Sequence, residues 1–182
     1  MRRELSTSIS VATSTTAIVP GEDLPPEEGL VRPVEGQEGE WRTHSTKRGD
    51  ISFSYPSSFF LLDKTDTEIP CVYMSPREIF FSEFAGGYVE PIELCLLEDS
   101  SAGHWMNDLT KARTSKAIIN GKNAVITSVE GEVGAYGGVF STLSILFPDQ
   151  RLRITGMNRW QADAYPMIKE TVERIGESIV LK

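Results

Sequence analysis

The stretch Ala117-Ile-Ile-Asn-Gly-Lys-Asn-Ala-Val-Ile126 decides the fold that we expect for this chain. Asn120-Gly121 lies between two apolar runs, and both residue types accept the positive φ angles of a two-residue type I′ turn. Such a turn matches the twist of the two antiparallel strands that it joins. The sequence therefore predicts a β-hairpin over residues 117–126, and with it a sheet that is built from hairpins.

Strand-like segments lie on both sides of this hairpin. Ile51, Phe53 and Tyr55 alternate with serines, which is the period of a half-buried strand, and Pro56 ends the run. The other predicted strands are Trp41–His44, Phe59–Leu62, Ile69–Met74, Ile92–Leu97, Val139–Phe147 and Leu152–Thr155. Because turns rather than crossover helices join them, the sheet should be mainly antiparallel.

Two further segments have helical spacing. The first follows Ser100-Ser101, which can cap a helix, and its apolar face consists of Trp105, Met106, Leu109 and Ala112. The second follows Asp163, tolerates Pro166 in its first turn, and has a stripe of Tyr165, Ile168, Val172, Ile175 and Ile179. Strands followed by a helix, more strands and a final helix predict the α+β class, with helices packed on a mainly antiparallel sheet.

The chain divides into a tail and one folded domain. Residues 1–40 are rich in Ser and Thr, include Pro25-Pro26-Glu27-Glu28, and have no sustained period of 2 or 3.6. Such a segment cannot bury enough apolar area to offset its ordering entropy, so we expect a disordered N-terminal tail or linker. Hydrophobic residues make up 40% of the chain, which is enough for a core in residues 41–182.

The first residues suggest a location outside the cytoplasm. Arg2-Arg3 stands before an uncharged stretch from Leu5 to Pro20, which is the charge layout of a weak export signal. The alternative is a plain tail, or a stalk that once followed a membrane anchor. The export and stalk readings both predict an extracytoplasmic domain.

Charge disfavours a nucleic-acid partner, and hydropathy disfavours a transmembrane segment. The net charge of −8 disfavours nucleic acid, whose binding depends on Lys and Arg that replace condensed counterions. No apolar run approaches the roughly 20 residues that a transmembrane helix needs. We therefore predict no nucleic-acid partner and no transmembrane segment in this chain.

Cys71 and Cys95 are the only cysteines, too few for a zinc motif. If the segment between them folds back near Glu83, the two residues lie opposite each other on antiparallel strands, where a disulfide can form. The alternative is a pair of buried free thiols, because the sequence does not fix the register. Both readings stay open.

Little else in the sequence indicates catalysis. His44 and His104 are the only histidines, and neither lies in a motif with a nucleophile. His104 follows Glu98 and Asp99, so a small metal or proton-transfer site competes with a solvent-facing residue at a helix start, which we favour. We predict no catalytic residue, no metal and no cofactor.

A long loop carries the best candidate for a binding site. Phe80, Phe81, Phe84 and Tyr88 lie between two predicted strands, where Gly86-Gly87 allows the chain to bend. Aromatic anchors in a loop are typical of recognition surfaces. The alternative, which we favour slightly, is that these rings fold down over one edge of the core.

Three short motifs carry a resemblance to a known family. Ile51-Ser-Phe-Ser-Tyr-Pro56, Asn120-Gly-Lys-Asn-Ala124 and Ile175-Gly-Glu-Ser-Ile179, in this order, resemble the PsbP-like superfamily over about residues 41–182. Its members include lumenal photosystem accessory and assembly proteins, and membrane-anchored bacterial domains. The resemblance implies an α/β/α sandwich with an antiparallel sheet, and a non-enzymatic accessory domain outside the cytoplasm.

Two functions follow as expectations. In the first, the domain docks on a protein complex at a membrane surface, such as a photosystem, through the aromatic loop. In the second, it is a small-molecule or ion-binding domain of a bacterial envelope lipoprotein, which would show a pocket with convergent polar groups. An enzyme is the disfavoured third reading.

Overall fold

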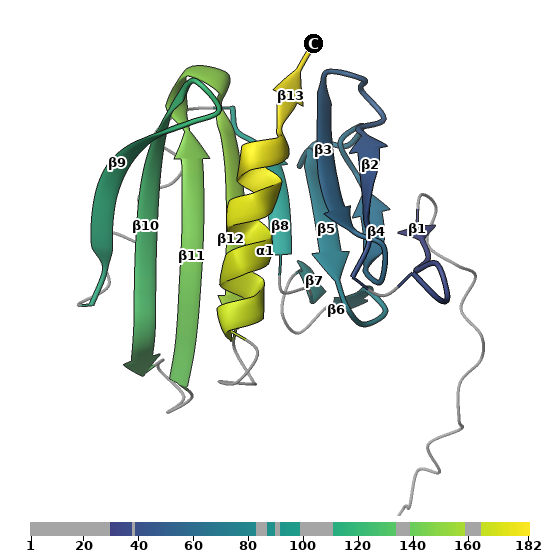
Figure 1. Ribbon diagram of the computed structural model, residues 1–182, viewed down its shortest axis with the longest axis horizontal. Helices are drawn as coiled ribbons and strands as arrows, with labels where there is room; N and C mark the ends of the chain where they lie inside the picture. Colours follow the sequence, from purple (N-terminus) through teal and green to yellow (C-terminus); the bar gives the residue numbers. More distant parts are fainter. Residues whose placement is uncertain are drawn as a thin grey trace, which may run out of the picture.

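A computed structural model describes residues 30–37, 39–82, 87–89, 92–98, 111–133, 139–158 and 165–182. These residues form the strands β1 to β13 and the helix α1 (Figure 1). The helix predicted from Trp105, Met106 and Leu109 lies outside the described residues, as does most of the predicted tail.

An eight-stranded sheet, antiparallel throughout, is the largest element of the structure. It begins with β1 (Leu30–Val31), β4 (Phe60–Asp63), β5 (Cys71–Ser75) and β8 (Ile92–Leu96). It continues with β12 (Leu152–Asn158), β11 (Val139–Phe147), β10 (Lys122–Val133) and β9 (Arg113–Ile119). A 3-10 turn at Pro148–Gln150 joins β11 to β12. Hairpin connections alone account for β9–β10–β11–β12, as expected for neighbours in the chain.

Two smaller sheets complete the described part. One consists of β13 (Val180–Leu181), β3 (Ile51–Pro56) and β2 (Trp41–Ser45). The other is a two-stranded hairpin of β6 (Phe80–Ser82) and β7 (Gly87–Val89). The small three-stranded sheet stands beside α1 in Figure 1, so the two together form a second layer.

Helix α1 (Tyr165–Ser178) packs on β11, β12 and β3. Its predicted apolar stripe is confirmed at Ile168, Val172 and Ile175, which are buried. Gly156 of β12 lies directly beneath the helix, because a Cβ atom there would stand 2.6 Å from Cγ2 of Val172 and 2.7 Å from Cγ2 of Ile168. The helix therefore rests against the backbone of the sheet.

The core fills the space between these two layers. It combines every second residue of the large sheet with β3 and α1, as alternation along strands requires. Its buried members include Phe53, Tyr55, Leu61, Met74, Ile92, Leu94, Leu143, Ile145, Phe147, Ile154, Val172 and Ile175.

The predicted β-hairpin over residues 117–126 is confirmed. Ile119 pairs with Lys122, and the two residues between them have positive φ angles, 49° for Asn120 and 74° for Gly121. Positive φ at both central positions defines a type I′ turn. The expected antiparallel sheet is confirmed with it.

The predicted fold class is wrong. We expected an α+β sandwich in which helices pack an antiparallel sheet, but the described residues are mostly antiparallel strand and include one α-helix. The main body is an eight-stranded sheet. The expectation failed because part of what we took for loop, residues 80–82, 87–89 and 127–133, forms strand. A single 14-residue helix then covers only part of one face.

Candidate partner-binding site

The β6–β7 hairpin is an excursion between two central strands of the large sheet. It lies between β5 and β8 in the sequence, and these two strands pair with each other from Cys71–Cys95 to Met74–Ile92. Within the hairpin, Phe80 pairs with Val89 and Phe81 with Tyr88. The hairpin lies at the lower end of β5 in Figure 1.

Phe80 and Phe81 are both exposed. The exposed fraction is 57% for Phe80 and 52% for Phe81, whereas the preceding Ile79 is buried. Ile79 therefore anchors the hairpin to the body, while the two rings that follow keep about half of their surface in water. Phe80 and Phe81 are therefore accessible to a partner at the surface, while the alternative that the four rings cover one edge of the core stays a prediction.

The two other aromatic candidates are less informative. Phe84 lies outside the described residues, and Tyr88 is described only through its backbone in β7. The structure thus brings Phe80, Phe81 and Tyr88 onto one hairpin through their strand pairing.

A polar rim borders the exposed rings. Arg32 forms an ion pair with Glu78 at 3.4 Å, and both side chains are more than half exposed. Such a pair contributes little to stability in water. The backbone N–H of Arg77 donates to Oγ of Ser75 and fixes the turn that leads into the hairpin. An apolar centre with a polar rim is the usual anatomy of a protein interface.

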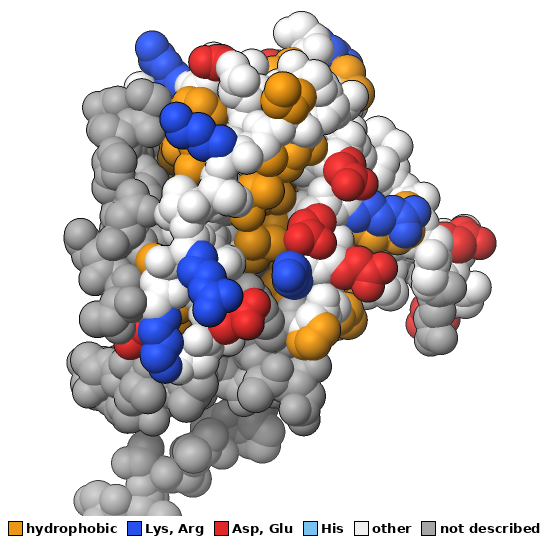
Figure 2. Space-filling view, turned by 60° about the vertical axis from the view of Figure 1, so that its left-hand side comes forward, with side chains coloured by type: hydrophobic (Ala, Val, Ile, Leu, Met, Phe, Trp, Pro, Cys, Tyr) orange, Lys and Arg blue, Asp and Glu red, His pale blue; other side chains and the backbone are white. Residues whose placement is uncertain are grey.

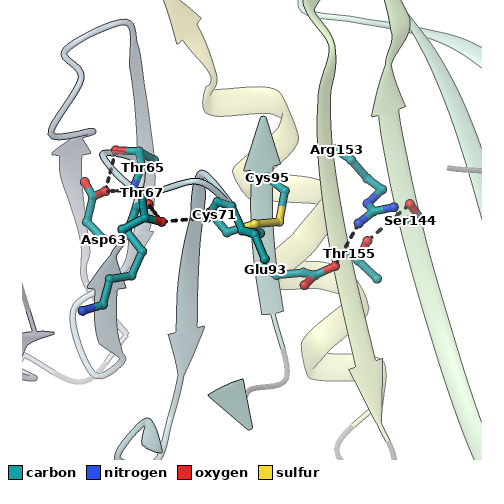
Figure 3. Close-up of a disulfide and its surroundings, with 11 residues drawn as sticks. Asp63, Thr65, Thr67, Cys71, Glu93, Cys95, Ser144, Arg153 and Thr155 are labelled. Atoms are coloured by element: carbon teal, nitrogen blue, oxygen red, sulfur yellow. Dashed lines mark hydrogen bonds and ion pairs between the residues drawn. A yellow bond between two sulfur atoms is a disulfide. The ribbon is translucent and has the colours of Figure 1, made fainter. Parts of the chain in front are cut away.

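A disulfide closes the base of this excursion. Cys71 and Cys95 are directly opposed in the β5–β8 register and are joined, with 24 residues of sequence separation and a Cα–Cα distance of 4.1 Å (Figure 3). The N–H of Leu96 donates to the carbonyl of Pro70, so Cys71–Cys95 is the narrow, non-hydrogen-bonded type of pair. This opposed register is the one that the disulfide reading of the sequence requires, while Glu83 itself lies outside the described residues.

The same face of the sheet is polar around the disulfide. Arg153 and Glu93 form an ion pair at 3.3 Å, and Oγ1 of Thr155 donates to Oγ of Ser144 at 3.5 Å (Figure 3). The alternation of β12 places these groups opposite to the apolar side chains that face α1. Among the described residues, the neighbours of the disulfide on this face are therefore polar, and Ser144 and Thr155 are buried.

A buried His–Asp pair was not expected from the sequence. Nε2 of His44 on β2 donates to Oδ2 of Asp63 on β4 at 2.7 Å, with exposed fractions of 18% and 2% for the two side chains. Asp63 also accepts from the N–H of Lys47 and from the N–H and hydroxyl of Thr65. The pair therefore ties the small sheet to the large one.

These hydrogen bonds set the charge state of Asp63. Burial alone would raise the pKa of this carboxyl group, but the hydrogen bonds from His44, Thr65 and Lys47 lower it to about 2. Nearby, burial raises the pKa of the Tyr55 hydroxyl, against the opposing effect of Arg42. No sequence motif signals the pair, because its members are 19 residues apart on strands of different sheets.

The metal or proton-transfer reading of His104 lies outside the described residues, as do His104 and Asp99 themselves. Glu98 follows β8, and its carbonyl accepts from the guanidinium of Arg151 at 3.2 Å. Within the ranges that the structure describes, no cluster of three His, Cys, Asp or Glu side chains could hold a metal ion.

No protein-family model matches this sequence, and no curated protein matches it either. Among the described residues, no helix has the length and apolar character that crossing a membrane requires.

Proposed function

We propose that this chain is a non-catalytic binding domain that acts outside the cytoplasm and docks through its β6–β7 hairpin on a protein of a membrane-associated complex. The exposure of Phe80 and Phe81 carries the proposal. Burial of the half of each ring that is now in water would contribute roughly 2–3 kcal/mol in total. Aromatic side chains of this kind are frequent binding hot spots.

Three further observations support the parts of this proposal. The Cys71–Cys95 disulfide favours an oxidising compartment. The resemblance of the Ile51–Pro56 motif to PsbP-like proteins favours an accessory role, with a photosystem as one such complex. His44 has a structural role that requires no catalysis, because its Nε2 is hydrogen-bonded to the buried carboxylate that ties the two sheets together and its ring packs against Phe53 and Tyr55.

Site-specific photo-crosslinking tests the hairpin directly. A benzoylphenylalanine at position 80 is irradiated with the membrane fraction of the source organism, and the same group at position 118 serves as the control. Ile118 is also exposed, but it lies on the edge strand β9. We expect one discrete protein adduct from position 80, which the additional substitution Phe81→Ser abolishes. Adducts that are the same from both positions would refute the proposal.

A flotation assay separates a protein partner from a lipid surface. The native chain and the Phe80→Ser/Phe81→Ser variant are each mixed with protein-free vesicles of phosphatidylglycerol and phosphatidylcholine. We expect neither to float. Flotation of the native chain, lost in the variant, would show that the rings enter lipid and would contradict the protein-docking proposal.

A second function, small-molecule binding, is favoured by one specific observation. A pocket of about 490 Å³ lies at the β9 edge of the large sheet and is lined by both basic and acidic side chains. Volumes of this size are typical of ligand sites.

A further inference from the structure

Helix α1 leaves the last two strands of the large sheet largely uncovered. It packs on β11, β12 and β3, while β10 and β9 extend beyond it (Figure 1). One cross-strand row shows which side chains share its face: Arg113 pairs with Ser128, Ser128 with Leu143, and Leu143 with Gly156. Since Gly156 lies beneath α1, Arg113 and Ser128 face the same side as the helix.

The side chains of this face change from polar to apolar along the strands. On β9 they are Arg113, Ser115, Ala117 and Ile119, and their partners on β10 are Ser128, Ile126, Ala124 and Lys122. Ile119 and Ile126 are partly buried and pack against the core. Figure 2 shows a band of hydrophobic side chains on this side, with mainly basic side chains along one flank and a mixture of acidic and basic ones along the other. The apolar stripe, from the row of Ile126 to the row of Ile119, covers four residue steps of strand, or about 13 Å, and begins one row beyond Arg113.

The pocket lies at the polar end of this stripe. Its lining within the described residues consists of Lys111, Ala112, Arg113, Ser128 and Glu130, and its volume is about 490 Å³. Two cations and one carboxylate give this lining a net charge of +1. Neither Lys111 nor Arg113 forms an ion pair with a carboxylate within the described ranges.

A β-bulge shapes this end of β10. The β10–β11 register shifts between Val129 and Glu132, and Gly131 there has a φ of 63°. The N–H of Gly131 donates to Oγ of Ser141 at 3.1 Å, and Nζ of Lys111 donates to its carbonyl at 2.8 Å. Bulges bend a strand, redirect side chains and are frequent beside binding sites. This bulge holds the ammonium group of Lys111 beside the pocket.

We propose that the pocket and the stripe together bind a small amphiphile with one monoanionic head group, of the carboxylate class. The head group lies between Lys111 and Arg113, with the hydroxyl of Ser128 in reach as a donor. Its alkyl tail follows Ala117, Ile126 and Ile119 along the sheet. Glu130 repels a second negative charge, so a carboxylate is preferred over a phosphate monoester dianion. This inference gives the small-molecule function a ligand class, and it uses no residue of the β6–β7 hairpin.

Calorimetric titration with sodium decanoate below its micelle concentration tests the inference. We expect saturable binding of one decanoate per chain, and binding of acetate at least tenfold weaker, because acetate has no tail for the stripe. Arg113→Gln should weaken decanoate binding about tenfold, since charge-assisted hydrogen bonds are the stronger kind. Lys116→Gln is the matched control: it removes the same charge from the same strand, but its side chain points to the opposite face.

Each outcome of these titrations either supports or overturns the proposed amphiphile site. Saturable decanoate binding that is weakened about tenfold in Arg113→Gln and kept in Lys116→Gln supports the site, provided that both variants melt at the native temperature. Absence of saturable binding, equal weakening in both variants, or equal affinity for acetate and decanoate would overturn it. Glu130→Gln should strengthen binding of decyl phosphate severalfold, and an unchanged affinity would refute the preference for a monoanion.

Discussion

Both elements that cover the large sheet pack on it through the apolar core, but only the small sheet adds a buried charged contact. Helix α1 lies on β11 and β12 through apolar side chains, and it comes so close at Gly156 that a Cβ atom has no room. The β2–β3 sheet is tied to β4 through the buried Asp63 carboxylate, which accepts four hydrogen bonds. The helix contact depends on apolar packing, whereas the small sheet has the charged contact of Asp63 in addition to the buried side chains of β3.

This difference has a physical consequence for stability. Apolar contacts respond to cavities and overpacking and are indifferent to pH. A buried ionised group is strongly destabilising once it loses its partners. Because it also titrates, its contribution to stability depends on pH. The two attachments should therefore fail under different perturbations, and each can be tested without the other.

Removal of the Asp63 carboxylate should have the largest effect. Asp63→Ala leaves the N–H groups of Lys47 and Thr65 and Nε2 of His44 without their acceptor in a buried site. We expect a loss of about 3–5 kcal/mol in the free energy of unfolding, measured by urea denaturation.

Asp66→Ala is the matched control for this variant. Asp66 pairs with Lys47 at 3.3 Å, but half of its side chain is exposed. Its loss should cost less than about 1 kcal/mol. Equal losses in the two variants would show that the buried His44–Asp63 pair contributes no more to the free energy of unfolding than an exposed ion pair does.

The disulfide lies between the two attachments and should rank next. Cys71 and Cys95 are 24 residues apart, and a crosslink of this span lowers the entropy of the unfolded chain. In the chain-entropy model, Cys71→Ser/Cys95→Ser costs about 3–4 kcal/mol. The measurement is urea denaturation of the native chain and of the double variant, each with and without reductant. Reductant should lower only the native chain to the level of the variant, and an effect on both would contradict the crosslink as the cause.

The sequence predicted the apolar attachment far better than the charged one. The stripe of Ile168, Val172 and Ile175 repeats at helical spacing, and the Asn120-Gly121 turn has a local rule, so both could be read from neighbouring residues. The fold class could not, because strands β6 and β7 form where the sequence suggests only a long loop. His44–Asp63 has no local signal, since strand pairing in space brings the two residues together.

The candidate binding residues show the same limit. Four aromatic residues marked the loop, but whether a ring faces the core or water depends on contacts made by the folded chain. Ile79 turned out to be the buried anchor, and Phe80 and Phe81 the exposed pair. The Lys111–Arg113 pocket was missed altogether, because the bulge at Gly131 that shapes it depends on the β10–β11 register.

The charged attachment should weaken in acid. The pKa of Asp63 in the folded chain, about 2, is below its ordinary value of 3.8. A depressed pKa contributes stability that is present above pH 4 and lost as the pH falls from 4 to 2. The loss amounts to about 2 kcal/mol, since one pKa unit corresponds to roughly 1.4 kcal/mol. Asp63→Asn lacks this contribution, so the stability gap between it and the native chain should narrow by that amount between pH 5 and pH 2. A stability difference that stays constant between pH 5 and pH 2 would contradict the lowered pKa of Asp63.

The apolar attachment should show the smallest of these effects, and two glycines separate close packing from helix propensity. Gly156→Ala places a Cβ atom 2.6 Å from Cγ2 of Val172, a β-branched side chain that has little rotamer freedom in a helix. We expect a loss of about 1–2 kcal/mol in the free energy of unfolding, measured by urea denaturation and unchanged between pH 5 and pH 2.

Gly176→Ala is the matched control. Gly176 lies within α1, and a Cβ atom there would have its nearest contact at 3.3 Å from Cδ1 of Ile145, the flexible end of a side chain. Alanine is favoured over glycine inside a helix by about 1 kcal/mol, so this variant should be neutral or more stable. Destabilisation of both variants by the same amount would contradict the idea that α1 approaches the sheet most closely at Gly156. A loss confined to Gly156→Ala would locate that point at Gly156, where β12 passes beneath Ile168 and Val172.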